Sequence, residues 1–120
     1  MKKSIVLRSN QCDVVEADWG NLTWYASATL GNSQDMTIGR ALIRPGSENP
    51  LHSHPNCSEI LVVMQGIVKH RIENGQEVEL NPGDVITVPP DLPHNAINVS
   101  DEDALLFIAF SSANRETKGE

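Results

Sequence analysis

The chain has 120 residues, a length typical of one domain with its own hydrophobic core. Its formal net charge of −7 argues against nucleic acid and anionic membranes as partners, because both require a basic face. No apolar run approaches the roughly 18 residues of a membrane-spanning helix. The basic N-terminal residues are followed by an apolar segment that is too short for the core of a signal peptide. Without an export signal, Cys12 and Cys57 are expected to be reduced thiols, which predicts a cytoplasmic protein.

The sequence predicts a single domain over residues 1–120. The patterns in the first third of the chain predict strands. Residues 1–18 contain two short apolar bursts and predict an N-terminal arm or edge strands. Apolar and polar residues alternate over 22–30, which predicts a half-buried strand with Leu22 and Trp24 on its apolar face. A turn at 31–35 leads to a strand over 36–44, which places Arg40 and Arg44 on one face.

The remainder alternates between short strands and turns. Residues 60–64 form a continuous apolar run, and 67–72 pairs with 76–80 across Asn74-Gly75, a strong hairpin signal. Strands follow over 85–88, 95–99 and 104–110, with a proline-rich turn at 89–93, and the polar tail 111–120 is expected to be frayed. Because no stretch has helical periodicity, the fold class is all-β, a sandwich or barrel.

One stretch carries residues suited to metal binding. His52 and His54 are one residue apart, so on an extended strand their side chains share a face. Glu59 follows five residues after His54. Two imidazoles and a carboxylate on one face are suitable ligands for a divalent metal.

These residues belong to two spaced motifs. Residues 46–66 read G-x5-H-x-H-x4-E-x6-G, and residues 83–98 read G-x5-P-x-D-x2-H-x3-N. The pair resembles the two motifs of the cupin superfamily at nine of ten fixed positions, the exception being Asp91, which stands where glycine is usual. Because aspartate tolerates positive φ better than most residues, we expect the turn at Asp91 to be retained.

The resemblance implies a small antiparallel jelly-roll β-barrel (a double-stranded β-helix) with a metal inside. The implied ligands of a divalent ion are His52, His54, Glu59 and His94. Iron(II) is the first metal to test, and manganese, nickel, cobalt, copper and zinc are also compatible with this set. Six-coordination would leave two positions open for water, dioxygen or a bidentate oxygen ligand. The resemblance also implies a homodimer, for which residues 4–30 are the expected surface.

The expected function is metal-dependent chemistry on a small polar or anionic molecule, with an oxygenase of the dioxygenase type first. Isomerase, lyase or decarboxylase chemistry is the alternative, and a non-catalytic binding or storage barrel is a second one. Glu59 is also a catalytic candidate. Tyr25 is either a substrate donor or acid, or a surface phenol, and Arg40 is either an anchor for a substrate carboxylate or a solvated side chain.

Four other residues have two interpretations each. His70 alternates with Val68 and Ile72, and we favour a core or interface histidine over a fifth ligand. Cys57 lies near the expected metal, but buried free cysteine is common, so a redox role is the less favoured interpretation. Trp19 and Trp24 are expected to serve packing or an interface rather than to contact substrate.

Overall fold

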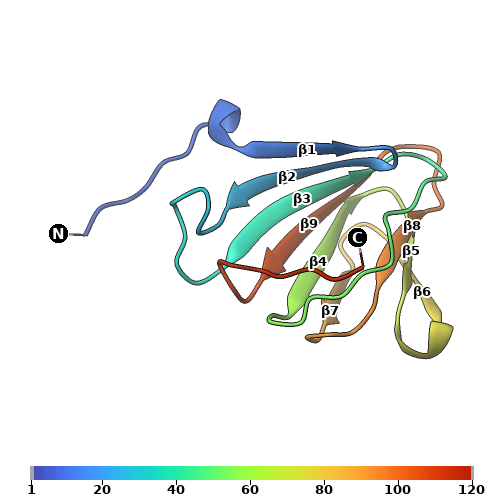
Figure 1. Cartoon of the computed structure of the whole chain (residues 1–120). Coiled ribbons are helices and arrows are strands. Elements are labelled where there is room, and N and C mark those ends of the chain that lie inside the picture. Colours follow the sequence, from blue (N-terminus) through green and yellow to red (C-terminus); the bar gives the residue numbers. More distant parts are fainter. Residues whose placement is uncertain (1, 120) are drawn as a thin grey trace.

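A computed structural model describes residues 2–119 (Figure 1). Within that range the chain forms strands joined by turns, with two 3-10 turns at Ser9–Gln11 and Glu73–Gly75. None of the helical segments in the described range is long and apolar enough to cross a membrane. The strands are β1 Asp13–Ala17, β2 Gly20–Ala26, β3 Thr37–Ile43, β4 Glu59–Gln65, β5 Val68–Arg71, β6 Glu77–Leu80, β7 Val85–Val88, β8 Asn95–Asn98 and β9 Ala104–Phe110.

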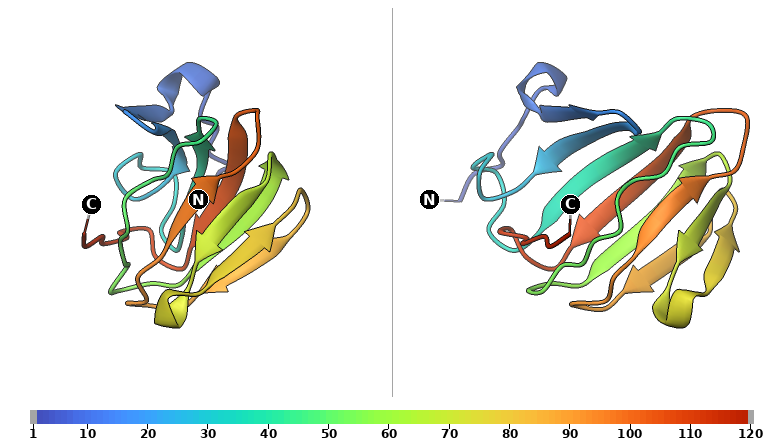
Figure 2. Two further views of the ribbon diagram at one scale, coloured as in Figure 1. Left: turned by 90° about the vertical axis from the view of Figure 1, so that its right-hand side faces the viewer. Right: turned by 45° about the vertical axis from the view of Figure 1, so that its right-hand side comes forward.

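The strands form two antiparallel sheets. The larger has the order β1-β2-β3-β9-β4-β7, and the smaller has the order β6-β5-β8. The smaller sheet lies at one end of the larger, while β1 and the N-terminal arm lie at the other (Figures 1 and 2). This arrangement is the expected jelly-roll barrel, and the all-β prediction is confirmed.

Strict alternation gives the larger sheet two different faces. On β3 and β9 the residues Ala41, Ile43, Leu106, Ile108 and Phe110 are buried in one apolar core. Burying each of the large side chains contributes roughly 1.5–3 kcal/mol, so this face stabilises the barrel. We call it the inner face; the residues between them on each strand form the outer face.

The strand predicted over 22–30 is too long. Strand β2 ends at Ala26, and its register with β3 shifts between Trp24 and Ala26. The chain then turns, because Asn32 Oδ1 accepts from the Ser27 amide at 3.1 Å and Asn32 Nδ2 donates to the Tyr25 carbonyl at 2.8 Å. Local side-chain bonds of this kind compete with a sheet ladder, which explains the early end of β2.

The expectation of a frayed tail is wrong for residues 111–119. The Ser111 amide donates to the Ser58 carbonyl at 3.1 Å, and Ser53 and Lys118 exchange two backbone hydrogen bonds of 2.9 Å. The tail runs beside the loop that carries the first two histidines (Figure 2). The polar composition of the tail predicted that it would be frayed, but backbone hydrogen bonds hold this segment in place. Met1 and Glu120, at the ends of the predicted arm and tail, lie outside the described residues.

Candidate metal centre

Backbone pairing sets the positions of the ligands. His52 and His94 are directly opposed: the His52 amide donates to the His94 carbonyl at 3.1 Å, and the His94 amide donates back at 2.8 Å. Asp91, with φ of 67°, donates its amide to the His54 carbonyl at 2.8 Å, so the turn at this position has the positive φ expected of it. Glu59 is the first residue of β4 and points to the inner face.

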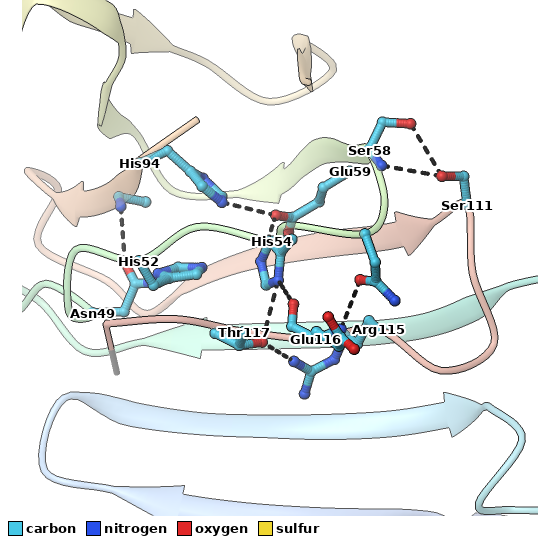
Figure 3. Close-up of polar contacts among 12 residues, drawn as sticks. Asn49, His52, His54, Ser58, Glu59, His94, Ser111, Arg115, Glu116 and Thr117 are labelled. Carbon is cyan, nitrogen blue, oxygen red and sulfur yellow. Dashed lines mark hydrogen bonds and ion pairs between the residues drawn. The ribbon is translucent and has the colours of Figure 1, made fainter. Parts of the chain in front are cut away.

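The four predicted ligands form one cluster. A nitrogen or oxygen atom from each of His52, His54, Glu59 and His94 lies within 4.8 Å of every other (Figure 3). All four side chains are buried, with at most 9% of any residue exposed. The expected convergence of residues far apart in sequence is therefore present in the fold.

Hydrogen bonds fix how two of the imidazoles face the cluster. His52 Nδ1 lies 2.7 Å from the Pro50 carbonyl, and His54 Nδ1 lies 2.9 Å from the Glu116 carbonyl. Because a carbonyl only accepts, each Nδ1 carries the proton, and in the neutral ring each Nε2 has a free lone pair. This is the tautomer that a metal-binding histidine needs.

His94 is held differently. Its Nδ1 lies 3.2 Å from Nε2 of His70, with the two rings stacked at 27°. His70 is 1% exposed, and burial lowers its pKa to about 4, so it is neutral and accepts the Nδ1 proton of His94. His70 thus contacts the far side of a ligand ring, a position that agrees with a core histidine rather than a fifth ligand.

The unpartnered atoms of the cluster suit a cation. His54 Nε2, His94 Nε2 and Glu59 Oε1 are buried without a hydrogen bond, although both nitrogens lie 3.3 and 3.0 Å from the Glu59 oxygen. Burial raises the pKa of Glu59, but His54 and His94, when they carry protons on Nε2, hold it at about 2, and a divalent ion replaces those protons. A carboxylate and lone pairs aimed at one point fit a divalent ion, so these residues can hold it.

A cavity that is partly open to solvent lies in front of the cluster. Its walls are mainly apolar inner-face residues, and both tryptophans, Trp19 and Trp24, contribute to them. The Trp24 ring packs against Gly39, where an added Cβ would lie 2.6 Å from the indole. Both tryptophans pack in or against the hydrophobic core.

The other sequence candidates are not brought to the cluster. Tyr25 stacks on Phe107 at a centroid distance of 6.0 Å, and Phe107 pairs with Arg40 on the outer face. Neither Tyr25 nor Arg40 lines the cavity. Cys57 is buried in the core, and burial raises the pKa of its thiol, which disfavours a reactive thiolate.

Sequence reasoning missed three residues from the tail. Arg115 lines the cavity, the Glu116 carbonyl holds His54, and Thr117 Oγ1 lies 3.2 Å from His54 Nδ1 (Figure 3). No periodicity or motif marks this segment, so only the fold could place it beside a ligand.

The cupin domain model matches residues 39–110, and the chain therefore belongs to the cupin family. Germin-like protein subfamily 3 member 3 of Arabidopsis thaliana is 37% identical over 95 residues, which cover 75% of this chain and 45% of that protein. Auxin-binding protein ABP19b of Prunus persica is 33% identical over 85 residues, covering 68% of this chain and 41% of the relative. The chain thus spans less than half the length of these relatives.

Solved structures show the same fold. Oxalate decarboxylase from Lactobacillus farciminis, in a formate complex, superposes with a TM-score of 0.83 at 23% identity, covering 92% of this chain and 34% of that one. An S161A mutant of oxalate decarboxylase OxdC from Bacillus subtilis gives a TM-score of 0.81 at 22% identity, covering 89% and 29%.

Proposed function

We propose that this cupin is a metal-dependent enzyme acting on a small oxygen-bearing molecule, and that its reaction is of the oxygenase type. A divalent ion would bind at His52, His54, Glu59 and His94. It would act as a Lewis acid with open coordination positions for oxygen ligands. The four residues hold it, and the apolar wall in front of them limits access of bulk water.

The composition of the cavity wall carries this proposal. Among residues 2–119, the lining groups that could exchange a proton near neutral pH are the four ligands and His70, whose Nε2 already accepts from His94. Arg115 also lines the wall, but a guanidinium stays protonated. A lyase, isomerase or decarboxylase moves a proton at carbon and relies on a positioned acid or base. Beyond the ligands and His70, the wall within the described chain offers no such group, which favours oxygen chemistry.

Decarboxylation is the second candidate, supported by the likeness of the barrel to oxalate decarboxylases. A binding role is the third, since one relative is named as an auxin-binding protein. Iron(II) is the first metal to test and manganese the second, because one study of the Bacillus subtilis oxalate decarboxylase concerns its Mn(II) centres.

Oxygen uptake tests the proposal. The iron-loaded chain is incubated with small carboxylates, diketones and catechols, with Glu59→Gln as the inactive control, and dissolved oxygen and released carbon dioxide are measured. We expect oxygen consumption that depends on metal, substrate and Glu59. Carbon dioxide release without oxygen uptake would instead support the decarboxylase, and binding without any turnover would support the binding barrel.

Two further expectations stay proposals. A cytoplasmic location is supported by the two free cysteines, Cys12 and Cys57. A homodimer through residues 4–30 is supported by the exposure of Val14 and Val15 on β1, which pairs only with β2 and so forms one edge of the larger sheet.

A further inference from the structure

The three histidine ligands take their orientation from different parts of the chain. Nδ1 of His52 lies 2.7 Å from a carbonyl two residues earlier in its own loop, and Nδ1 of His94 lies 3.2 Å from His70 on β5. The partner of His54 Nδ1 is the Glu116 carbonyl at 2.9 Å, which lies 62 residues further along the chain and beyond the last strand. One ligand therefore depends on the tail for its orientation.

Asn56 joins the loop of His54 to the tail. Its Nδ2 donates to the Asn114 carbonyl at 2.8 Å, and its Oδ1 accepts from the Glu116 amide at 2.8 Å. Both ends of the side-chain amide are therefore bonded to the backbone of the segment whose Glu116 carbonyl faces His54. Because Asn56 is exposed, these two hydrogen bonds, and not core packing, are its contribution to the fold.

Backbone pairing holds the tail on the other side of His54. The Ser53 amide donates to the Lys118 carbonyl at 2.9 Å, and the Lys118 amide donates back at 2.9 Å. The Glu116 carbonyl and Thr117 Oγ1, which lies 3.2 Å from His54 Nδ1, are placed between this pair and the side-chain contacts described above (Figure 3). The tail thus presents its carbonyl to the imidazole from a segment that is fixed at two points.

Little apolar burial supports this docking. Among residues 111–119, Ala113 is buried and the guanidinium of Arg115 stacks on the Trp24 ring at 4.0 Å, while the other side chains are exposed or half-buried. A segment with few buried apolar contacts opens locally at a lower free energy than a core strand. The two hydrogen bonds of Asn56 are therefore a substantial part of what keeps the tail in contact with His54.

We propose that Asn56 is a positioning residue of the metal centre. By clamping the tail it holds the Glu116 carbonyl on His54 Nδ1, which keeps Nε2 aimed at the ion and makes the imidazole a better ligand. The docked tail thereby raises the metal affinity of the cluster, and by linkage a bound ion strengthens the docking of the tail by the same factor. The proposal rests on the metal site of the proposed function and not on its oxygen chemistry.

The zinc affinity of the full chain tests the clamp, measured by competition with a fluorescent chelator. Asn56→Ala should weaken it about 10-fold, the lower end of the roughly 10–100-fold loss that is typical when an outer partner of a ligand is removed. The lower end is expected because the Phe110 ring, 4.8 Å from the His54 ring, still packs against it. Asn114→Ala is the matched control: Asn114 takes part through its backbone carbonyl, so the zinc affinity should not change.

A spectroscopic readout separates positioning from a general loss of stability. In NMR spectra of the zinc-loaded protein, the Nδ1 proton of His54 should exchange with water faster in Asn56→Ala than in the wild type. The Nδ1 protons of His52 and His94 are internal references and should keep their exchange rates, because their acceptors lie outside the tail.

Linkage gives a second measurement on the wild type alone. Zinc should slow hydrogen exchange at the Glu116 and Lys118 amides, whose acceptors are Asn56 and Ser53. The Gln76 amide in the turn between β5 and β6 is the control, because it bonds within its own turn and its local exchange should not respond to zinc.

Equal zinc affinity of Asn56→Ala and the wild type overturns the proposal, and so does a His54 Nδ1 proton whose exchange is unchanged. Should the variant not fold, the wild-type measurement still decides: tail amides that zinc protects no more than the Gln76 amide contradict the proposal. A wild type that binds no zinc would overturn the proposed function as well, whereas failure of oxygen uptake with these results intact would count against the oxygenase alone.

Discussion

The two faces of the six-stranded sheet carry different kinds of residues although the same strands form both. On the inner face, Glu59 joins three histidines beside an apolar wall, and every ionisable group there contacts another polar group or borders the cavity. On the outer face, Arg40, Tyr25 and Phe107 lie among exposed apolar side chains with no histidine nearby. On this sheet, Glu59 therefore points inward to the cluster, whereas Arg40 and Tyr25 point away from it.

Adjacent residues on β4 test this contrast most strongly. Glu59 faces the cluster and Ile60, 46% exposed, faces away. Glu59→Gln should weaken divalent-metal affinity about 70- to 900-fold, because a metal-binding free energy of roughly 10–16 kcal/mol shared among four ligands gives about 2.5–4 kcal/mol for each. Ile60→Ala should change it less than about 2-fold. Competition with a fluorescent chelator measures both, and equal losses would remove the distinction between the faces.

Acid should destabilise the metal-free protein through its inner-face histidines. Burial lowers the pKa of His52, and lowers that of His70 from 6.5 to about 4. Between pH 6.5 and about 4, the unfolded chain binds a proton at His70 that the folded chain does not bind. The stability that the neutral histidine contributes above pH 6.5 is therefore lost as the pH falls towards 4. His70 alone accounts for about 3 kcal/mol.

Urea unfolding of the metal-free protein at several pH values between 7.5 and 4.5 measures this loss. His70→Leu should flatten the profile over that window. Constant stability across it would show that the histidines are not buried in the neutral form.

The contact between His70 and His94 should matter for metal binding although His70 is no ligand. His70→Phe fills the space but cannot accept the Nδ1 proton of His94, and loss of such a partner typically weakens metal affinity by about 10–100-fold. The neighbouring residue Lys69 is exposed on β5, so Lys69→Ala is the matched control. Unchanged affinity in His70→Phe would mean that backbone pairing alone orients His94.

The N-terminal arm should matter least to the cluster. Removing residues 2–8 should leave metal affinity within about 2-fold of the full chain, because these residues lie far from the inner face (Figure 1). If residues 4–30 form the dimer surface, the same deletion should weaken self-association in sedimentation experiments. A deletion that releases metal would place the arm in the site.

The sequence predicts the features that depend on local patterns and motif spacing. It misses the features that depend on local side-chain hydrogen bonds or on contacts between distant parts of the chain. Strand β9 and the Asn74-Gly75 hairpin are predicted nearly to the residue, because apolar runs and turn chemistry are local signals. The ligands are predicted because motif spacing encodes the pairing of His52 with His94. The end of β2 is missed because Ser27 and Asn32 bond locally, and no pattern within the tail could place Arg115 on Trp24.

The central claim is that the four inner-face residues hold a divalent ion. Elemental analysis of the purified protein, prepared without chelator beside a His52→Ala variant, tests it most directly. We predict one equivalent of divalent metal per chain in the wild type and a loss of most of it in the variant. The absence of stoichiometric metal from the wild type under every growth condition, or full retention by His52→Ala, would contradict the account.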